Sequence, residues 1–163
     1  MKKELSKDYI LTLFNYIDGE LFWKVSKAKR TKIGDIAGCH KEKGYFHCGI
    51  DGTNYLIHRL IFAFHYGYMP KYIDHIDNNP SNNKIENLRE ATYSQNQCNK
   101  TLQKNNTSGV KGVTWVKSRC RWVVKVQIDN IQKQIGYFKD LEFAELISNE
   151  ARSKYHGKFA RNV

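Results

Sequence analysis

The hydrophobic and polar positions in the first part of the chain predict a helix, three strands and a second helix. Ser6 can cap a helix over residues 7–16, whose apolar side chains recur at helical spacing. The three strand-like runs are short and bounded by turn formers: 20–25, 44–50 and 53–58. The last two flank Asp51-Gly52, a dipeptide typical of a β-hairpin. A strongly apolar segment, 59–66, predicts a helix that the following glycine ends.

A polar segment in the middle of the chain lies between two short runs with apolar residues. YIDHI at 72–76 and KIENLR at 84–89 predict strands on either side of the turn DNNPSNN. TYSQNQCNK at 92–100 then begins a helix. The predicted order is therefore strand, turn, strand, helix.

The last third of the chain predicts a small sheet and one helix. Apolar and polar residues alternate in three strand-like runs: 110–117, 121–128 and 133–138. An amphipathic helix follows, with Asp140 as its N-terminal cap and Gly157 at its end. Residues 100–108 hold few apolar side chains and several turn formers, so they predict a linker. We expect two domains, 1–99 and 109–163, joined by it.

Charge separates the same two parts. The chain of 163 residues has a net charge of +11. Residues 1–98 contribute +3 and residues 99–163 contribute +8, so the C-terminal part is the one expected to hold a polyanion. Nucleic acid is the first candidate and an anionic membrane surface the second. No apolar run is long enough to span a bilayer, and Asp8 and Asn15 interrupt any secretory signal core, so we expect an unexported protein.

The cysteines offer only a weak alternative. None of the four forms a CxxC pair, so a zinc ribbon is disfavoured. Cys39-His40 and His47-Cys48 could supply four soft ligands, but their spacing matches no zinc finger. Free thiols are the favoured interpretation, since disulfides are not expected in an unexported chain.

Asp74, His75, Asn87 and Asn96 form the candidate catalytic set. A hard cation such as Mg²⁺ prefers oxygen ligands, and a carboxylate with one amide oxygen suffices if DNA phosphates complete the shell. The neighbouring imidazole can take a proton from water near neutral pH. An EF-hand is excluded because its required glycine and glutamate are absent. Residues in the turn are interpreted as turn formers: Asp77, Asn78, Asn79, Asn82 and Asn83.

Roughly residues 55–99 resemble the HNH endonuclease family, and this segment contains HRLIFAFHYG and DHIDNNPSNNKIENLREATYSQNQCN. In particular, this segment resembles the phage and intron-encoded homing branch of that family. The resemblance implies that His75 is the general base, that Asp74 and Asn96 hold one divalent metal ion, and that Asn87 fixes the loop carrying His75. Asparagines where some relatives have histidine make this an HNN variant, which favours Mg²⁺ or Mn²⁺ over zinc.

GVKGVTW, RWVVKV, IGYF and GKFARN resemble the Apetala-type DNA-binding domain of plant ethylene-response factors. This implies a three-stranded sheet whose face enters the major groove of DNA. Lys111 stands where the plant pattern has arginine. Alternation along the strands brings cations and flat rings within reach of DNA: Trp115, Lys117, Arg119, Arg121, Trp122 and Lys125. Gln127, Lys133 and Gln134 are weaker candidates.

Candidate phosphate contacts also occur before residue 60. Arg59 could reach a phosphate, whereas the adjacent His58 is interpreted as structural. The basic loop 24–32 could touch the DNA backbone. The N-terminal residues up to 55 are expected to complete the nuclease fold.

The sequence thus predicts an α+β protein with a ββα-metal (HNH) nuclease core, followed by a small three-stranded antiparallel sheet packed on one helix. We expect a metal-dependent endonuclease of homing type that nicks or cuts double-stranded DNA. The alternatives are a non-cleaving DNA-binding regulator and a protein of RNA or membrane surfaces, since the tryptophans could stack on single-stranded bases. No membrane segment or small-molecule cofactor is expected. We further expect a monomer or homodimer in the cytoplasm of the host cell, and an origin in a phage or mobile element.

Overall fold

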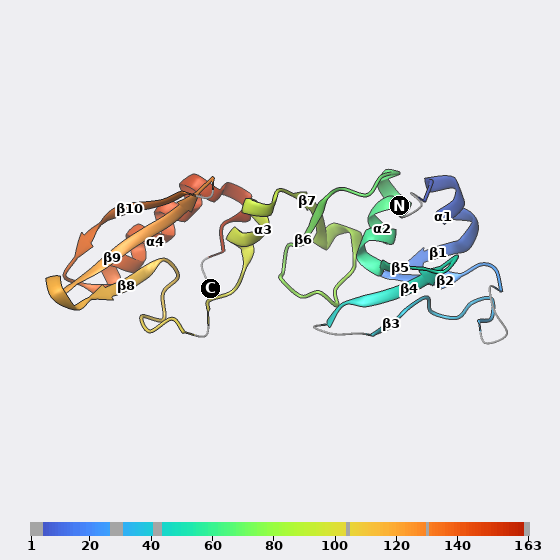
Figure 1. Cartoon of the computed structure of the whole chain (residues 1–163), viewed down its shortest axis with the longest axis horizontal. Helices are drawn as coiled ribbons and strands as arrows, with labels where there is room; N and C mark the ends of the chain where they lie inside the picture. The colour runs from blue at the N-terminus through green and yellow to red at the C-terminus, as the bar shows by residue number, and fades with distance from the viewer. Residues whose placement is uncertain (1–4, 27–30, 41–43, 104, 130, 162–163) are drawn as a thin grey trace. The chain divides into compact units, whose positions relative to one another are not determined.

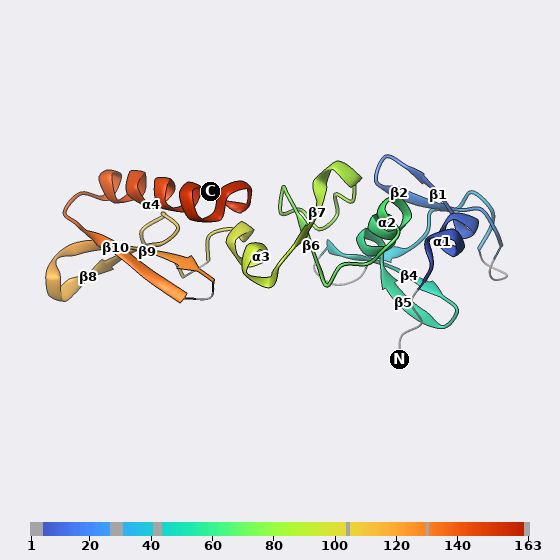
Figure 2. The same cartoon turned by 90° about the horizontal axis from the view of Figure 1, so that it is seen from above.

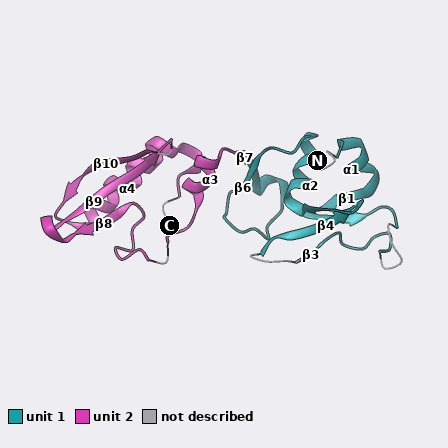
Figure 3. Cartoon of the chain, viewed as in Figure 1, with its two compact units in different colours: residues 1–90 teal, residues 91–163 magenta. Residues whose placement is uncertain are grey.

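The computed structural model describes residues 5–26, 31–40, 44–103, 105–129 and 131–161. The chain divides into two compact units, Met1–Glu90 and Ala91–Val163 (Figure 3). Both mix helices with small sheets. No helix in the described part of the chain is long and apolar enough to cross a membrane.

The first unit packs two helices against short strands (Figure 1). Its elements are α1 (Lys7–Leu13), β1 (Phe14–Ile17), β2 (Glu20–Trp23), β3 (Cys39–His40), β4 (Phe46–Ile50), β5 (Thr53–Leu56), α2 (Ile57–Tyr66), β6 (Tyr72–His75), η2 (Ile85–Asn87) and β7 (Leu88–Ala91). β1 pairs with β2, β3 to β5 form a second sheet, and β6 lies beside β7. The buried core includes Ile10, Phe14, Leu21, Leu60 and Ile61.

The first helix ends earlier than the sequence predicted. Ser6 caps α1 as expected, because its hydroxyl accepts a hydrogen bond from the Tyr9 amide. Phe14 is already extended, and it pairs with Trp23 across the β1–β2 hairpin with ring centroids 4.6 Å apart. The predicted helix over 7–16 was therefore wrong at its C-terminal end, because burial of Phe14 in the hairpin outweighs local helical periodicity.

The central elements follow the predicted order of strand, turn, strand and helix, but two predicted strands were too long. The strand predicted at 84–89 begins only at Leu88, because Ile85–Asn87 form the 3-10 helix η2. The strand predicted at 53–58 ends at Leu56, since Ile57 and His58 already belong to α2. The hairpin turn at Asp51-Gly52 is present between β4 and β5, and both of its residues have positive φ. α2 ends at Gly67, which adopts the left-handed conformation. After β7 comes α3 (Tyr93–Asn99), which begins at a capping box formed by Thr92 and Gln95.

The second unit is an antiparallel sheet with one long helix against it (Figure 2). It contains α3, β8 (Val113–Val116), η3 (Lys117–Arg119), β9 (Arg121–Ile128), β10 (Ile131–Phe138), α4 (Leu141–His156) and η4 (Gly157–Phe159). The strand order is β10-β9-β8. Asp140 caps α4 as predicted. The core between sheet and helix is built on Val113, Val124 and Ala144.

The units separate between Glu90 and Ala91, whereas the sequence placed the end of the nuclease domain at residue 99. α3 is grouped with the sheet and α4, because Cys98 is buried in one cluster with Phe159 of η4. The predicted domains, 1–99 and 109–163, were defined by expected function, and compact packing alone does not test them. They stay a prediction.

Candidate active site and nucleic-acid interface

Two adjacent polar residues of β6 are buried. Asp74 is 2% exposed and His75 is 6% exposed. A carboxylate removed from water requires a partner, and Arg89 of β7 provides it. The Arg89 guanidinium contacts Asp74 Oδ2 through Nε at 2.7 Å and through its second amino group at 2.6 Å. Pairing of β6 with β7 thus places the carboxylate and the guanidinium together.

The His75 ring is held on several sides. Its Nε2 lies 3.1 Å from Oδ1 of Asn83, which is itself only 6% exposed. The His58 ring packs edge-on at 5.1 Å between centroids, and the Tyr45 ring lies at 6.1 Å. Burial lowers the pKa of His75, while the contact with Asn83 and the nearby carboxylates Asp77 and Asp74 act in the opposite direction. The ring is therefore neutral near pH 7 and able to accept a proton.

Asn83 corrects the sequence interpretation. It was predicted to be a turn former among other asparagines, yet it is buried and contacts the candidate general base. Asparagine is common in turns and can also hydrogen-bond to a buried side chain. In a run of turn-forming residues, the sequence therefore did not distinguish these two roles of Asn83. Arg89 was likewise not singled out, although its place opposite an aspartate in the predicted strand pair was a usable signal.

His58 lies deep in the same cluster. It is 6% exposed, and burial, followed by the neighbouring His75, Arg59 and His47, lowers its pKa to about 3. The neutral ring of His58 therefore packs beside His75 without adding charge. Its placement fits the structural role that the sequence suggested.

Asn87 organises the turn that follows His75. Its Oδ1 accepts from the Asp77 amide at 3.0 Å, and its Nδ2 donates to Asp77 Oδ1 at 2.9 Å and to the Asn82 carbonyl at 2.8 Å. Asp77 also accepts from the Asn79 amide and from Asn82 Nδ2. Partial burial opposes ionisation of Asp77, but these hydrogen bonds outweigh it and hold its pKa below the usual value.

The predicted metal ligands belong to different units. Asp74 lies on β6 in the first unit, and Asn96 lies on α3 in the second. A carboxylate and an amide oxygen are donors that suit Mg²⁺ or Mn²⁺, and Arg89 engages Oδ2 of the carboxylate. The donor set is thus chemically suited to a hard cation, and the pairing of Asp74 with Asn96 stays a prediction.

The structure disfavours the zinc alternative. Cys39 is exposed and pairs with His47 across β3 and β4, while Cys48 is buried. Burial, with a further contribution from Cys39, raises the pKa of Cys48 to about 12. Within the described ranges, no group of three or more His, Cys, Asp or Glu residues could hold a metal ion.

The sheet of the second unit presents two different faces. Val113, Trp122 and Val124 lie on the face against α4, and Trp115 is paired with Trp122 on that same face at 4.9 Å between centroids. Alternation places Arg121 and Lys125 on the opposite face. The two tryptophans therefore lie on the other face from Arg121 and Lys125, and the contact of all four residues with DNA stays a prediction.

The remaining candidate cations have varied surroundings. Lys117 and Arg119 are exposed in η3, where the Arg119 guanidinium lies 4.6 Å from the Tyr137 ring centroid. Lys133 lies on the α4 side, with its amine 5.4 Å from the Tyr155 ring centroid. Arg59 is half-buried and donates to the Lys71 carbonyl at 3.4 Å. Of the basic loop 24–32, residues 27–30 lie outside the described ranges.

Comparison with known proteins identifies the segment that carries the candidate active site. A family model described as HNH endonuclease matches residues 55–98, which include Asp74, His75, Asn87 and Asn96. The chain is 39% identical over 99 residues to Protein 3.8 of Escherichia phage T7, covering 58% of this chain and 79% of that protein. It is 35% identical over 107 residues to the Uncharacterized HNH endonuclease L560 of Acanthamoeba polyphaga mimivirus, covering 64% of this chain and 54% of that protein. No solved structure matches.

Proposed function

Since this chain belongs to the HNH endonuclease family, we propose that it is a metal-dependent DNA endonuclease of homing type, which hydrolyses phosphodiester bonds in duplex DNA. The observation that carries the proposal is the buried, neutral His75, held by Asn83 beside the buried carboxylate of Asp74. A protein that only bound DNA would have no need of a neutral imidazole at this position.

His75 acts as the general base. Oδ1 of Asn83 can only accept a hydrogen bond, so its contact with His75 requires the proton on Nε2. In the neutral ring the lone pair is then on Nδ1, which takes a proton from the attacking water. The water attacks the phosphorus in line with the 3′ oxygen that leaves.

Asp74 and Asn96 are the residues that would hold Mg²⁺ or Mn²⁺. The bound cation supplies charge neutralisation at the phosphate and at the leaving oxygen. Asn87 fixes the turn 77–82 through its hydrogen bonds, and with it the backbone that directly follows His75. In this scheme Asn87 is a positioning residue, and Asn83 fixes the tautomer of the base.

The C-terminal unit binds the substrate as an Apetala-type module. Its outer sheet face carries Arg121 and Lys125, and the adjoining η3 turn carries Lys117 and Arg119. The net charge of +8 over residues 99–163 supports contact with a DNA backbone. Arg59 contributes a further phosphate contact. Trp115 and Trp122 lie on the other face of the sheet, and their contact with DNA stays a separate prediction.

The relatives support a proposal for the biological setting. Both come from viruses, one of them a phage, so we place the activity in the cytoplasm of an infected host cell. A homing role would make the gene a mobile element. One catalytic centre per chain would let a monomer nick one strand and a homodimer cut both.

Supercoiled plasmid and DNA from the locus that holds the gene test the proposal directly. We expect Mg²⁺ to support nicking and a chelator to abolish it. His75→Ala should lower the rate by about 10²- to 10⁴-fold, the range for loss of a general base. His65→Ala is the matched control. His65 lies on α2 and packs beside Tyr16 and Phe64, so its replacement should leave the rate nearly unchanged. Two outcomes would contradict the proposal: the parent protein still cleaves both substrates when the chelator is present, or the His75→Ala variant still cleaves both at the parent rate.

A further inference from the structure

A cavity of about 720 Å³ lies within the second unit, beside the end of β9 that β8 does not cover. β8 pairs with β9 from Arg121 to Val124, whereas β10 pairs with it as far as Ile128. The remaining walls come from α3, from the segment that follows α3 and from the last turns of α4. We call it the edge cavity, and its volume is in the range of sites that enclose a small organic molecule.

Hydrogen bonds of the unit itself hold these walls. The Gly112 carbonyl accepts from the Lys125 amide at 2.8 Å, and a Cβ at Gly112 would lie 2.6 Å from the Lys125 carbonyl oxygen, so this close approach requires glycine. His156 of α4 donates through Nε2 to the Gln127 carbonyl at 2.6 Å. In the part of the chain that the structure describes, Nδ1 of the same ring is buried without a hydrogen-bond partner, which is uncommon in a packed core.

The lining of the edge cavity is cationic. Its lysine and arginine residues are Lys100, Lys111, Lys125 and Arg152, and among the described residues that line it none is aspartate or glutamate. Two carboxylates act on the lining from outside, Asp129 on Cys98 and Glu145 on Arg152. The lining therefore keeps an excess of positive charge, which favours an anionic occupant.

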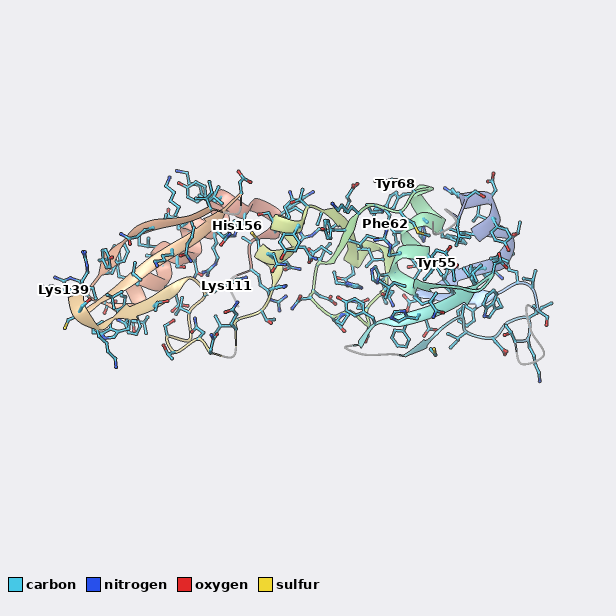
Figure 4. All side chains as sticks on the ribbon, viewed as in Figure 1. Tyr55, Phe62, Tyr68, Lys111, Lys139 and His156 are labelled. Atoms are coloured by element: carbon cyan, nitrogen blue, oxygen red, sulfur yellow. The ribbon has the colours of Figure 1, made fainter. Side chains whose placement is uncertain are left out.

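The Lys111 amine is half-buried and keeps a donor for such an occupant. Its Nζ donates to the Cys98 carbonyl at 2.7 Å and to the Lys100 carbonyl at 2.5 Å, which leaves one of its three N–H groups. Burial, followed by the nearby charge of Arg152, lowers the pKa of Lys111 to about 8, and an anion beside the amine would favour its charged form. Figure 4 labels Lys111 and His156 towards one end of the second unit and Lys139 at the other.

The lining also contains groups that recognise a nucleobase. Tyr93 is 53% exposed, and an exposed tyrosine ring can stack on a base of any type. Gln97, Gln127 and Gln132 line the same cavity and carry amides, which donate to and accept from the polar edges of bases. A site for phosphate alone would require cations but neither a ring nor amides. The combination favours a nucleotide.

The edge cavity is continuous with the outer face of the β8–β10 sheet. Lys125 belongs to that face and also lines the cavity. Alternation along β9 places Gln127 on the same face, and Gln132 is its direct partner on β10. A DNA strand on the outer face would therefore reach the edge cavity, but only a nucleotide that has left the base stack could enter it.

We propose that the edge cavity holds one unstacked nucleotide of a DNA strand whose duplex part lies on the outer face. Tyr93 stacks on the base of this nucleotide, and Lys100 and Lys111 contact its phosphate. The inference rests on the proposed function, because it takes the outer face as the DNA-binding surface. It adds a site at which the second unit distinguishes an unpaired nucleotide from a paired one, as at a junction between single- and double-stranded DNA.

Two labelled DNA substrates with the same number of phosphates test the proposal. One is a blunt duplex, and the other carries a short single-stranded overhang. Binding is measured by fluorescence anisotropy with a chelator present, so that the DNA stays intact. The measured quantity is the junction preference, which is the ratio of the two affinities. We expect the parent to bind the overhang substrate at least about fivefold more tightly, the lower limit for one base stacked on a ring.

Tyr93→Leu should lower the junction preference to within about twofold of unity, because it keeps apolar bulk and removes the stacking ring. Tyr155→Leu is the matched control. Tyr155 lies on α4, where its ring packs beside the Lys133 and Lys154 amines and does not line the edge cavity. Its replacement should leave the junction preference unchanged.

Lys100→Gln tests the phosphate contact independently of the ring. Lys100 is exposed, so loss of its charge should leave the fold intact and lower the affinity for the overhang substrate more than that for the blunt duplex. Lys139→Gln removes the same charge from another exposed position of the second unit, and should lower both affinities equally. Iodouracil in the overhang should also cross-link to Tyr93 on irradiation, as read by mass spectrometry of the digested complex.

Several outcomes would overturn the inference. Equal affinity of the parent for the two substrates would do so, as would equal changes in Tyr93→Leu and Tyr155→Leu. A free deoxynucleoside monophosphate that binds as tightly as the overhang, or an RNA overhang that binds more tightly than DNA, would refute the assignment to a DNA strand. If Tyr93→Leu does not fold, the comparison of Lys100→Gln with Lys139→Gln decides the outcome. Failure of the proposed function has a different signature, because absence of Mg²⁺-dependent nicking would leave the metal-free junction preference in place.

Discussion

At the scale of single residues, the chemistry of the proposed active site depends on which nitrogen of His75 carries a proton. A neutral imidazole has one donor and one acceptor nitrogen, and a contact with an amide oxygen assigns the donor. Asn83 supplies that oxygen at Nε2, and the buried rings of His58 and Tyr45 limit the orientations that the His75 ring can adopt. The tautomer is therefore set by a neighbour that is not itself a general base.

Replacement of Asn83 by aspartate should move the pH dependence of nicking. A carboxylate at the same position stabilises the imidazolium, so the pKa of His75 rises and the acidic limb of the rate profile moves up by about one pH unit or more. Asn83→Ala should instead lower the plateau rate by about 10- to 100-fold. Single-turnover nicking measured from about pH 5 to about pH 9 distinguishes the two effects.

Asn79→Asp is the control for this experiment. It places the same charge in the same turn, but Asn79 is exposed and its side chain accepts from the Ser81 amide. We expect a smaller movement of the acidic limb, because solvent screens the added charge. Equal movements in the two aspartate variants would mean that Asn83 has no special relation to His75.

His58 makes a prediction about stability rather than rate. Its pKa is about 3 in the folded protein against a usual value of 6.5. Below pH 6.5 the unfolded state binds a proton that the folded state resists, so this histidine makes stability fall as pH decreases from 6.5 towards 3. The limiting slope is about 1.4 kcal/mol per pH unit, or about 2 kcal/mol between neutral pH and about pH 5.

Urea unfolding of the parent and of His58→Gln at both pH values measures this contribution. The substitution will lower stability at neutral pH through lost packing, so the relevant quantity is the difference between the two pH values. We expect that difference to be smaller in His58→Gln than in the parent. The same pH dependence in both proteins would show that protonation of His58 is not linked to unfolding.

The sequence allowed some site residues to be anticipated and not others. Asp74 and His75 stand out because a carboxylate and an imidazole are adjacent in an apolar strand. Asn83 and Arg89 do not, because their importance comes from contacts with Asp74 and His75 that only the folded backbone creates. A residue type that is common in turns gives no local signal of such a contact.

At the scale of secondary-structure elements, the turn after β6 behaves as a closed unit. Asn87 at the end of η2 accepts from one backbone amide and donates twice, so it joins both sides of the turn. Asp77 collects three donors in the same place. These contacts fix the chain that follows His75, and Ile85 of the same η2 packs against the core of the first unit.

Asn87→Asp should therefore be more harmful than its small change in shape suggests. The carboxylate can still accept from the Asp77 amide, but it loses both donors and places a second negative charge against Asp77. We expect a loss of about 2–3 kcal/mol in the free energy of unfolding, measured in urea near neutral pH. Nicking at a temperature where the variant stays folded should also fall, because the backbone beside His75 is released.

Asn82→Ala provides the comparison, since it removes one side-chain donor to Asp77 and introduces no charge. Its expected loss is about 1 kcal/mol, typical of a single hydrogen bond. If Asn87→Asp were no more destabilising than Asn82→Ala, the turn would not depend on Asn87 as described.

Element types were predicted well where pattern and turn chemistry agree. The Asp51-Gly52 hairpin and the cap at Asp140 follow from local rules, and both are present. The predicted helix at 7–16 was too long, because Phe14 fits the apolar pattern of a helix as well as that of a strand. Its pairing with Trp23 is a tertiary contact, which no short window of sequence contains.

At the scale of the whole molecule, the boundary between the two compact units differs from the end of the segment that matches the HNH family model. Composition indicated a basic C-terminal part, which the second unit contains. It did not indicate that α3, inside the segment matched by the HNH model, would pack with that unit. Cys98 has no recognisable partner in the sequence, because Phe159 is distant along the chain and the two residues meet only when the second unit folds.

Net charge alone cannot say which cations touch DNA, but the two faces of the β8–β10 sheet allow a test. Lys125 lies on the outer face and Lys133 on the α4 side. Lys125→Gln and Lys133→Gln each remove one charge from the same sheet, so both reduce the long-range field of the protein equally.

Binding to a labelled duplex is then measured by fluorescence anisotropy with a chelator present, from about 50 mM to about 300 mM salt. We expect Lys125→Gln to lower the slope of log affinity against log salt by about one, the effect of one lost phosphate contact, and Lys133→Gln to leave the slope nearly unchanged. Equal slopes in the two variants would mean that the sheet face does not decide contact, and the outer face would lose its assigned role.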